Sequence, residues 1–305
     1  VAGGQLIFDR AEGGKINVAE ADQSLMCSIR GNEIGMIFQE PMTALNPVLT
    51  VGRQLTEGLR VHKGLNKTEA KQSALELLEK VRIPEPEKRL DQYPHELSGG
   101  MRQRVVIAMA LACEPRLLIA DEPTTALDVT IQAEILALIE RLKQETGTAV
   151  LFITHDMAVV AQVADRVVVM FRGNKVEEGT VEQIFKNPQH AYTQSLLAAV
   201  PKLGEMKGTI YPERMRLITD EKNAPEPIIG SKDVLLEVRN LVTRFPMKSG
   251  LMRRVTANVH AVENVSFSIK KGETMALVGE SGCGKSTCGR SILRLVEPVS
   301  GQILL

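Results

Sequence analysis

The sequence predicts an α/β fold with a mainly parallel core sheet, and three features of its patterning lead to that prediction. Short apolar runs at residues 34–38, 117–120 and 149–154 each end at a polar residue, which is typical of buried parallel strands. A strongly amphipathic helical pattern covers residues 128–147. A glycine-rich segment, residues 279–287, lies between another apolar run and a helical pattern. Strands that alternate with helices favour a parallel sheet.

In the N-terminal third of the chain the pattern predicts a short strand at residues 6–8 and a helical subdomain at about residues 47–105. In this subdomain Asn66 and Glu69 form a capping-box pattern, and Pro84 with Pro86 ends the helix that follows. We expect a loop at residues 40–47, which holds two prolines, and a helix over residues 104–113. Residues 11–29 show no clear pattern.

After the third apolar run the pattern predicts a helix, a β-hairpin and two short helices. The predicted ranges are 157–164 for the helix, 166–178 for the hairpin, and 181–185 and 192–200 for the short helices. Two further strands at residues 234–241 and 261–269 precede the strand at 275–278 that leads into the glycine-rich segment.

The domain organisation predicted from the sequence is two domains joined by a linker. Residues 1–200 form the first domain, residues 201–231 carry prolines and charges with little periodicity and form the linker, and residues 232–305 begin a second domain. Gly301-Gln302-Ile303-Leu304 resembles Gly4-Gln5-Leu6-Ile7, an offset of 297 residues. We therefore expect the chain to be a window of a longer protein that contains an internal repeat.

Composition excludes several classes of protein. The chain has 305 residues with 44% hydrophobic and 24% charged residues, as in ordinary globular proteins. Its formal net charge is zero, so bulk electrostatics do not favour a nucleic-acid partner. The four cysteines have no metal-like spacing and are typical of reduced thiols. No apolar run reaches the roughly 18 residues that a membrane span needs, and the N-terminus has no signal-peptide pattern.

The segment at residues 279–287 has the spacing of a phosphate-binding loop, G-x-x-x-x-G-K-S, between a strand and a helix. Its backbone N–H groups would surround a polyphosphate, Lys285 would reach the β- and γ-phosphates, and the Ser286 hydroxyl would bind Mg²⁺. The alternative is a glycine-rich turn before a helix. The nucleotide-binding residues predicted here are Gly279, Ser281, Gly282, Cys283, Gly284, Lys285, Ser286 and Thr287.

Polar residues at the ends of three predicted strands suggest hydrolytic chemistry. Asp121 could bind Mg²⁺, and Glu122 could act as a general base for water. His155 could hold the γ-phosphate and the attacking water, whereas a lone histidine at a strand end is more often structural. Gln39 could bind Mg²⁺ or position water, and the alternative is a solvated side chain.

A second anion-binding pattern lies at the start of a helix. Ser98, Gly99 and Gly100 open this helix, and its first N–H groups and dipole favour an anion.

Together these motifs resemble the nucleotide-binding subunits of ABC transporters, over nearly the whole chain. Residues 97–103 look like the ABC signature, Asp121-Glu122 like the end of Walker B, and residues 126–128 like the D-loop. Gln39 looks like the Q-loop glutamine, His155 like the switch histidine, and Phe245 like the aromatic residue that stacks on adenine. The resemblance implies a P-loop NTPase fold of ABC type, with an antiparallel β subdomain and a helical subdomain, and it implies ATP and Mg²⁺ as ligands.

Other segments narrow the resemblance to the peptide/nickel importer group. They are residues 38–43, Met101, residues 187–193, residues 241–246 and residues 259–263. The last two are similar to two-domain subunits that serve import of glutathione or other small peptides. No cysteine cluster follows residue 192, so we expect no iron–sulfur centre.

The resemblance implies partners and a location. The expected partners are two transmembrane permease subunits, a periplasmic substrate-binding protein and the second ABC domain of the full-length chain. Residues 40–47 and the helical subdomain would contact the permease subunits. Nucleic acid is not an expected partner. The protein would lie at the cytoplasmic face of the bacterial inner membrane. One alternative is a soluble ABC ATPase of translation or DNA repair, but the sequence lacks the inserted coiled coils and basic arms that are common in such proteins. A second alternative is a nucleotide-binding regulator that does not hydrolyse ATP, but Glu122 and His155 argue against it.

In this family each ATP lies between the phosphate loop of one domain and the signature of the other. Asp121, Glu122, Gln39 and His155 would then belong to one site. Lys285, Ser286 and Phe245 would belong to the other, which Ser98, Gly99 and Gly100 would complete. One hypothesis is that residues 232–305 fold back onto residues 1–200 as a circular permutant of one domain, and the alternative is a detached β-rich tail. We expect weak or absent ATP hydrolysis from the isolated chain.

Overall fold

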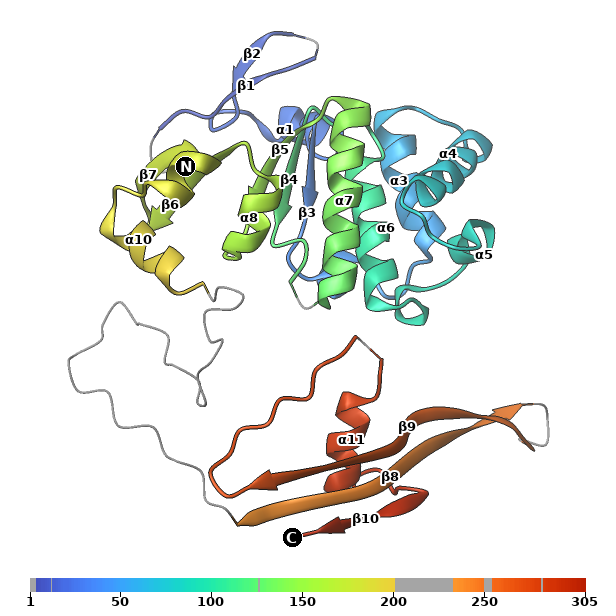
Figure 1. Cartoon of the computed structure of the whole chain (residues 1–305). Helices are drawn as coiled ribbons and strands as arrows, with labels where there is room; N and C mark the ends of the chain where they lie inside the picture. The colour runs from blue at the N-terminus through green and yellow to red at the C-terminus, as the bar shows by residue number, and fades with distance from the viewer. Residues whose placement is uncertain (1–3, 12, 126, 201–232, 250–253, 281) are drawn as a thin grey trace. The chain divides into compact units, whose positions relative to one another are not determined.

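The computed structural model describes residues 4–11, 13–125, 127–200, 233–249, 254–280 and 282–305 (Figure 1). The chain divides into two compact units, Val1–Thr219 and Asp220–Leu305. The predicted linker, residues 201–231, lies outside the described residues.

The first unit contains the predicted parallel sheet. Its strands are β3 (Ile34–Ile37), β4 (Leu117–Asp121) and β5 (Ala149–Ile153), in the order β3-β4-β5. Both pairings are parallel. The apolar runs in the sequence therefore correctly predicted the core strands, each of which carries β-branched or leucine side chains that suit a buried sheet.

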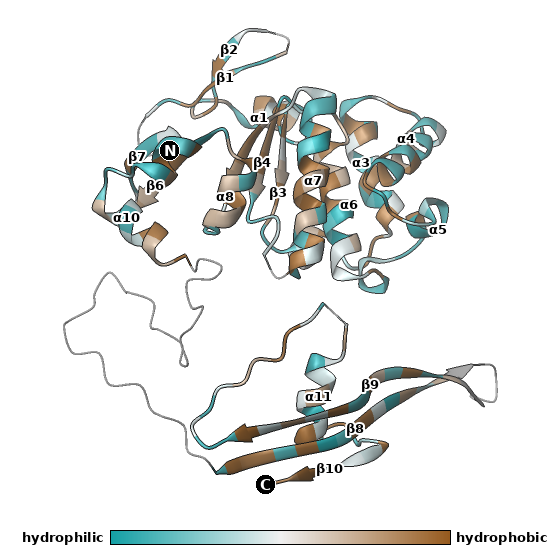
Figure 2. Cartoon of the chain, viewed as in Figure 1, coloured by the Kyte–Doolittle hydropathy of each residue, from teal (hydrophilic) through white to brown (hydrophobic). Residues whose placement is uncertain are grey.

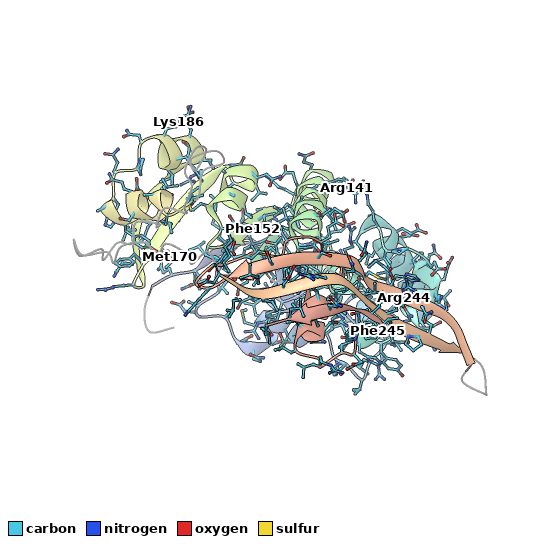
Figure 3. The ribbon with its side chains drawn as sticks, turned by 60° about the horizontal axis from the view of Figure 1, so that its bottom comes forward. Arg141, Phe152, Met170, Lys186, Arg244 and Phe245 are labelled. Carbon is cyan, nitrogen blue, oxygen red and sulfur yellow. The ribbon has the colours of Figure 1, made fainter. Side chains whose placement is uncertain are left out.

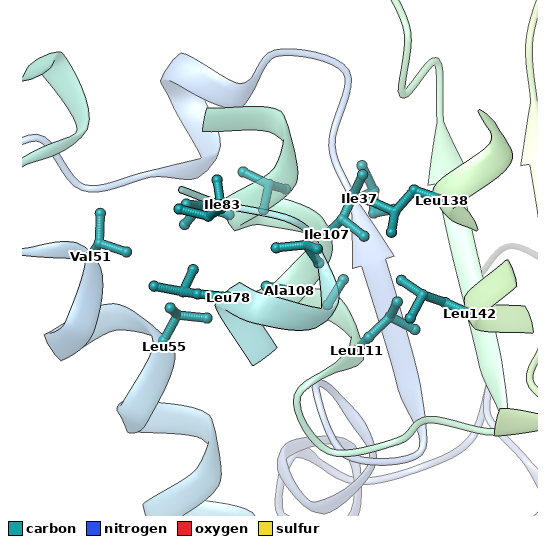
Figure 4. Packing of buried hydrophobic residues seen from close by; sticks show 14 of the residues in the cluster. Ile37, Val51, Leu55, Leu78, Ile83, Ile107, Ala108, Leu111, Leu138 and Leu142 are labelled. Carbon is teal, nitrogen blue, oxygen red and sulfur yellow. The ribbon is translucent and has the colours of Figure 1, made fainter. Parts of the chain in front are cut away.

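Helices α6 (Gly99–Leu111) and α7 (Val129–Thr146) cover one face of this sheet. The main hydrophobic core lies between these helices and the sheet, and it includes Ile37 of β3, Ile107 of α6 and Leu138 of α7 (Figure 4). Asp128 caps α7 at its N-terminus and Gly147 ends it in the left-handed conformation, so the helix agrees with the pattern predicted at residues 128–147. Helix α6 begins five residues earlier than the predicted residue 104, because Ser98 caps it.

The opposite face of the same sheet is apolar and exposed. Met36, Ile119 and Leu151 are aligned across the three strands. Leu151 is 52% exposed, Ile153 on the same strand 43%, and Met36 38%. Figure 2 shows the hydrophobic colour running along β3 and β4. This face is unusual, because the strands of a parallel sheet are ordinarily covered on both sides.

The helical subdomain is built from α3 (Val51–His62), α4 (Lys67–Lys80), α5 (Pro86–Leu90) and the 3-10 turn Pro94–Glu96. The predicted capping box of Asn66 and Glu69 is present at the start of α4. The predicted loop at residues 40–47 is partly wrong, since α2 (Pro41–Ala44) forms there. Proline fits the first position of a helix, where its missing N–H costs nothing.

The N-terminal part of this unit holds the strand predicted at residues 6–8, together with a second strand and a helix that the sequence pattern did not predict. Strands β1 (Ile7–Asp9) and β2 (Lys15–Asn17) form an antiparallel pair, and α1 (Gln23–Ile29) follows with Asp22 as its cap. The second strand and the helix have no more than seven residues each, too few for a clear periodicity.

The remaining elements of the first unit pack around a small core of their own. They are α8 (Met157–Val163), the antiparallel strands β6 (Arg166–Phe171) and β7 (Asn174–Thr180), and the helices α9 (Val181–Lys186) and α10 (Ala191–Ala198). Met157, Val169 and Ile184 are buried in this core. The predicted hairpin and the short helices on either side of it are therefore correct.

In its described residues the second unit consists of an antiparallel sheet and one helix. Its strands are β8 (Val234–Ser249), β9 (Arg254–Lys270) and β10 (Ser300–Leu304), in the order β10-β8-β9, and its helix is α11 (Lys285–Ile292). Both long strands extend well beyond the predicted ranges.

The antiparallel β subdomain that the resemblance implied is present. Pro246 is tolerated inside β8, because β10 pairs only with positions from Glu237 to Val242 and leaves the proline on a free edge.

One predicted strand is absent. Residues 275–278, the apolar run before the glycine-rich segment, are not in a strand, and Val278 is 89% exposed. An extended segment becomes a strand only through hydrogen bonds to a neighbour, and the described residues of this unit place only β10 and β9 beside β8. The hypothesis that this segment completes a permuted domain stays a prediction.

Candidate functional site

Glu122 lies directly after β4, at the carboxyl edge of the parallel sheet. Its N–H donates to the Ile153 carbonyl at the end of β5, which fixes the turn to the neighbouring strand. Its φ is +44°, in the left-handed region that favours glycine. Because Pro123 follows, and a residue before proline prefers extended backbone, this conformation is strained for two reasons.

The Glu122 carboxylate collects three hydrogen bonds from residues that are distant in sequence or one turn away. Gln39, after β3, donates its Nε2 to Oε2 at 3.0 Å. The Nδ1 of His155, after β5, lies 2.9 Å from Oε1. The Thr125 hydroxyl donates to Oε2 at 2.8 Å. The structure thus joins Gln39, Glu122 and His155, which the sequence places at three separate strand ends, as parallel strands do.

These contacts keep the carboxylate charged. The hydrogen bond from His155 is the largest cause of the lowered pKa of Glu122, followed by the bond from Thr125, and desolvation opposes both. An ionised carboxylate accepts protons at neutral pH. The side chain of Glu122 is 21% exposed and that of His155 is 76% exposed, so water reaches the cluster.

Asp121, the predicted Mg²⁺ ligand, is the last residue of β4 and is half-buried. Among the described residues no group of three or more His, Cys, Asp and Glu side chains is arranged to hold a metal ion. A Mg²⁺ ion held by one carboxylate together with hydroxyl, amide and phosphate oxygens does not require such a group. Asp121 and Gln39 therefore remain compatible with that role, which stays a prediction.

The predicted signature forms the first turn of α6. The Ser98 hydroxyl accepts from the Met101 N–H at 3.3 Å and caps the helix, so this oxygen is used in the cap. Gly99 and Gly100 are the first two residues of the helix. A Cβ at Gly100 would lie 3.1 Å from the side chain of Ile131 on α7, so this turn packs tightly against that helix.

The predicted phosphate loop leads into α11 in the second unit. Gly282 and Gly284 have positive φ values of +81° and +98°, and Gly284 is the N-cap residue of α11. Because glycine has no side chain, Gly284 does not cap the first N–H groups of α11. An anion bound at the start of a helix needs such uncapped N–H groups. These features are compatible with polyphosphate binding, which stays a prediction. Ser281 lies outside the described residues.

Lys285 contacts its own loop. Its Nζ donates to the carbonyl oxygens of Gly279 and Glu280, both at 2.7 Å, and lies 3.5 Å from the Cys283 sulfur. A bound phosphate would have to compete with these carbonyls for the ammonium group.

The strands behind this loop carry Phe245, the predicted adenine-stacking residue, which is 41% exposed on β8 (Figure 3). Its neighbour Arg244 binds Glu263 on β9 through two hydrogen bonds, and His260 contacts the same carboxylate at 2.7 Å. The Arg244 bond is the main cause that lowers the pKa of Glu263 to about 2.

The loop also packs closely against β9. A Cβ at Gly284 would lie 2.0 Å from the Ala261 carbonyl oxygen, so only glycine fits there. Two turns further along α11, the buried hydroxyls of Thr243 and Ser291 form a hydrogen bond of 2.8 Å that joins the helix to β8.

The sequence analysis missed two side chains that act on the Glu122 turn. Thr125 was not singled out, although a threonine three residues after an acid in a turn is positioned to bond it. Gln103 was assigned only to the signature motif. It is fully buried, and its Nε2 donates to the Pro123 carbonyl at 2.6 Å. Nothing local in the sequence signals that burial.

Comparison with known proteins gives two family matches. The model described as "ABC transporter" matches residues 6–125 and 262–305. The model described as "Oligopeptide/dipeptide transporter, C-terminal region" matches residues 176–225.

Individual relatives cover almost the whole chain. The glutathione import ATP-binding protein GsiA of Shigella boydii serotype 4 is 58% identical over 98% of this chain and 49% of the relative. The protein of the same name from Escherichia coli strain K12 is 57% identical over the same shares. The chain spans about half the length of the curated relatives it matches.

Proposed function

This chain belongs to the ABC transporter family, and from that premise we propose that it acts as an ATP-binding and ATP-hydrolysing part of an importer. The observation that carries the proposal is the contact of the Glu122 carboxylate with both Gln39 and His155 at the carboxyl edge of the sheet. A charged carboxylate with two polar partners and access to water is suited to activate a water molecule.

In the proposed reaction Glu122 accepts the proton of the attacking water. Its lowered pKa keeps it ionised at neutral pH, so it is ready as a base. Gln39 and Thr125 donate to Oε2, and His155, whose side chain is largely exposed, contacts Oε1. Asp121, one residue earlier, and the amide oxygen of Gln39 would hold Mg²⁺ in this site.

The second set of residues binds a separate nucleotide. The loop from Gly279 to Thr287 would surround the phosphates, Lys285 would exchange its carbonyl partners for phosphate oxygens, and the Ser286 hydroxyl would bind Mg²⁺. Bound Mg²⁺ supplies positive charge that offsets the charge of the phosphate oxygens. Phe245 would stack on the base. Ser98, Gly99 and Gly100 would contact the γ-phosphate of a nucleotide that a phosphate loop of this kind binds.

The transported substrate is proposed to be glutathione or another small peptide. Two relatives with 57–58% identity are named for glutathione import, and residues 176–225 match an oligopeptide/dipeptide transporter region. The proposed partners are two permease subunits and, indirectly, a periplasmic binding protein, and the proposed location is the cytoplasmic face of the inner membrane. None of the helices in the described part of the chain is both long and apolar enough to cross a bilayer.

The test is uptake by cells. The gene that carries this sequence is expressed with its neighbouring permease genes in a bacterial strain that lacks its own glutathione uptake, and labelled glutathione, dipeptide and nickel are supplied in turn. We expect glutathione uptake, and we expect Glu122→Gln to lower it at least about tenfold because the base is lost.

The matched control is Glu182→Gln. Glu182 is exposed and forms only a surface pair with Lys186, so this variant should transport like the wild type. Uptake of dipeptide or nickel without glutathione would replace the proposed substrate. Unchanged uptake in Glu122→Gln would contradict the proposed base.

A further inference from the structure

Gln103 on α6 has a buried side-chain amide, of which the nitrogen has a hydrogen-bond partner and the oxygen has none among the described residues. The side chain is completely buried, and Nε2 donates to the Pro123 carbonyl at 2.6 Å. Its Oε1 is also buried and has no hydrogen-bond partner among the described residues. Burying a polar atom without a partner costs free energy, so the amide is not explained by packing alone.

The two ends of this bond belong to the two motifs of the proposed site. Gln103 is five residues after Ser98, on the helix whose first turn is Gly99-Gly100. Pro123 directly follows Glu122. One side chain therefore connects the helix that begins with the signature to the turn that carries the proposed base.

The turn at Glu122 needs such an anchor. Its backbone is strained, with the positive φ of Glu122 before a proline. On the C-terminal side of the turn, the backbone bonds among the described residues are short-range, from Thr125 N–H to the Glu122 carbonyl and from Leu127 N–H to the Thr124 carbonyl. The Gln103 amide adds a bond to Pro123 from a helix whose apolar residues are buried in the main core.

We propose that Gln103 is a positioning residue. Its amide ties α6 to the Glu122 turn and holds the Glu122 carboxylate where Gln39 and His155 contact it. The mechanical part of this inference depends on the structure alone, and only its consequence for ATP turnover rests on the proposed function.

A matched pair of variants of the full chain tests the proposal. Gln103→Met keeps the length of the side chain and removes the donor. Thr148→Val is the control, because the buried Thr148 hydroxyl donates to the carbonyl of another proline, Pro115, at 2.7 Å, before the start of β4 rather than after its end. Both variants remove one buried bond to a proline carbonyl, but only the first bond reaches the Glu122 turn.

The readouts are NMR signals of the turn and of His155. In Gln103→Met we expect the amide exchange of Thr125 and Leu127 to rise at least about fivefold, because the turn opens locally. We also expect the imidazole Nδ1 resonance of His155 to move toward that of a free histidine. Thr148→Val should change neither. Unchanged exchange and an unchanged His155 signal in folded Gln103→Met would overturn the proposal.

A second variant and a kinetic readout complete the design. If Gln103→Met does not fold, Gln103→Asn, which keeps the amide but is too short to reach Pro123, takes its place with the same expected result. In the full-length transporter complex, turnover of ATP should fall at least about fivefold with the KM for ATP within about twofold. Equal turnover would overturn the positioning role. A wild-type complex without ATPase activity would instead contradict the proposed function, and the NMR readouts would still decide on Gln103.

Discussion

At the scale of single residues, Glu122 combines a proposed chemical role with an unfavourable backbone. Its φ of +44° before Pro123 costs folding free energy that a glycine would not require. The three hydrogen bonds that lower the pKa of its carboxylate stabilise the ionised form, but they lie at a partly solvated edge and replace bonds to water, so they offset only part of that cost.

We therefore predict that Glu122→Gly stabilises the first unit although it removes the proposed base. The expected gain is about 0.5–1 kcal/mol in the free energy of unfolding, since the relief of strain exceeds the extra entropy of glycine in the unfolded chain. Urea unfolding followed by circular dichroism measures it. A loss of stability would mean that the three carboxylate bonds are worth more than the strain.

Gly284 gives a second prediction, with its own control in the same loop. A Cβ at Gly284 would overlap the Ala261 carbonyl oxygen, and the φ of +98° is also unfavourable for other residues. Gly284→Ala should therefore destabilise the second unit by about 3 kcal/mol or more. At Gly282, φ is also positive, but nothing lies within 4 Å of the added methyl group.

Gly282→Ala should for that reason cost only about 1 kcal/mol, from backbone strain alone. Thermal unfolding of both variants, beside the wild type, measures the difference. Equal effects would show that α11 moves away from β9 at little cost.

Sequence reasoning reached the charged residues of the site because their chemistry is local. An acid, an amide and an imidazole at strand ends can be recognised in the sequence, and parallel pairing then brings them together. Gln103 could not be recognised in this way. It lies in an ordinary helical pattern, and its role depends on contact with Pro123, twenty residues later and on another element.

At the scale of elements, the β8–β9 ribbon is joined by an ion pair that depends on pH. Glu263 has a pKa of about 2 in the folded chain, below its ordinary value of 4.5, chiefly because Arg244 binds it, and His260 also contacts it. A carboxyl group with a lowered pKa stabilises the fold when it is ionised. This contribution is complete above about pH 4.5 and is lost as the pH falls toward about 2.

We predict that the stability of the second unit falls between these two pH values, and that Glu263→Gln reduces the slope. The measurement is the unfolding midpoint in urea at several pH values. Glu297→Gln is the control, because Glu297 also pairs with an arginine, Arg294, but through an exposed contact three residues away. An equal slope in Glu263→Gln and the wild type would contradict the assignment.

Elements with strong local signals were predictable, and those that depend on distant partners were not. The core strands carry continuous apolar runs, and α7 carries a long amphipathic pattern with a clear cap at each end. The strand expected at residues 275–278 has the right composition, but strand formation requires a hydrogen-bonded neighbour, which composition does not supply. The long ribbon extends past its predicted ends because pairing between β8 and β9 continues into polar residues.

At the scale of the whole molecule, each unit has a hydrophobic core of its own. Ile107 is fully buried in the main core of the first unit, and Leu241 is fully buried in the core of the second. Because each core has its own buried residues, we predict two separable unfolding transitions in calorimetry.

Core variants assign these transitions. Ile107→Ala should lower only the first-unit transition, and Leu241→Ala only the second, each by about 2–5 kcal/mol of unfolding free energy. Ile107→Val, which removes one methyl group, should cost about 0.5–1.5 kcal/mol. If either alanine variant shifted both transitions equally, the two units would unfold as one cooperative body.

The strained turn at Glu122 also has an evolutionary consequence. Folding alone would favour glycine at this position, so glutamate is held there only as long as its carboxylate is needed. In a lineage that no longer used the site, drift would be expected to replace Glu122 early, and without harm to the fold. Under the proposed role, the residue at this position therefore indicates whether such a protein is still under selection for ATP turnover.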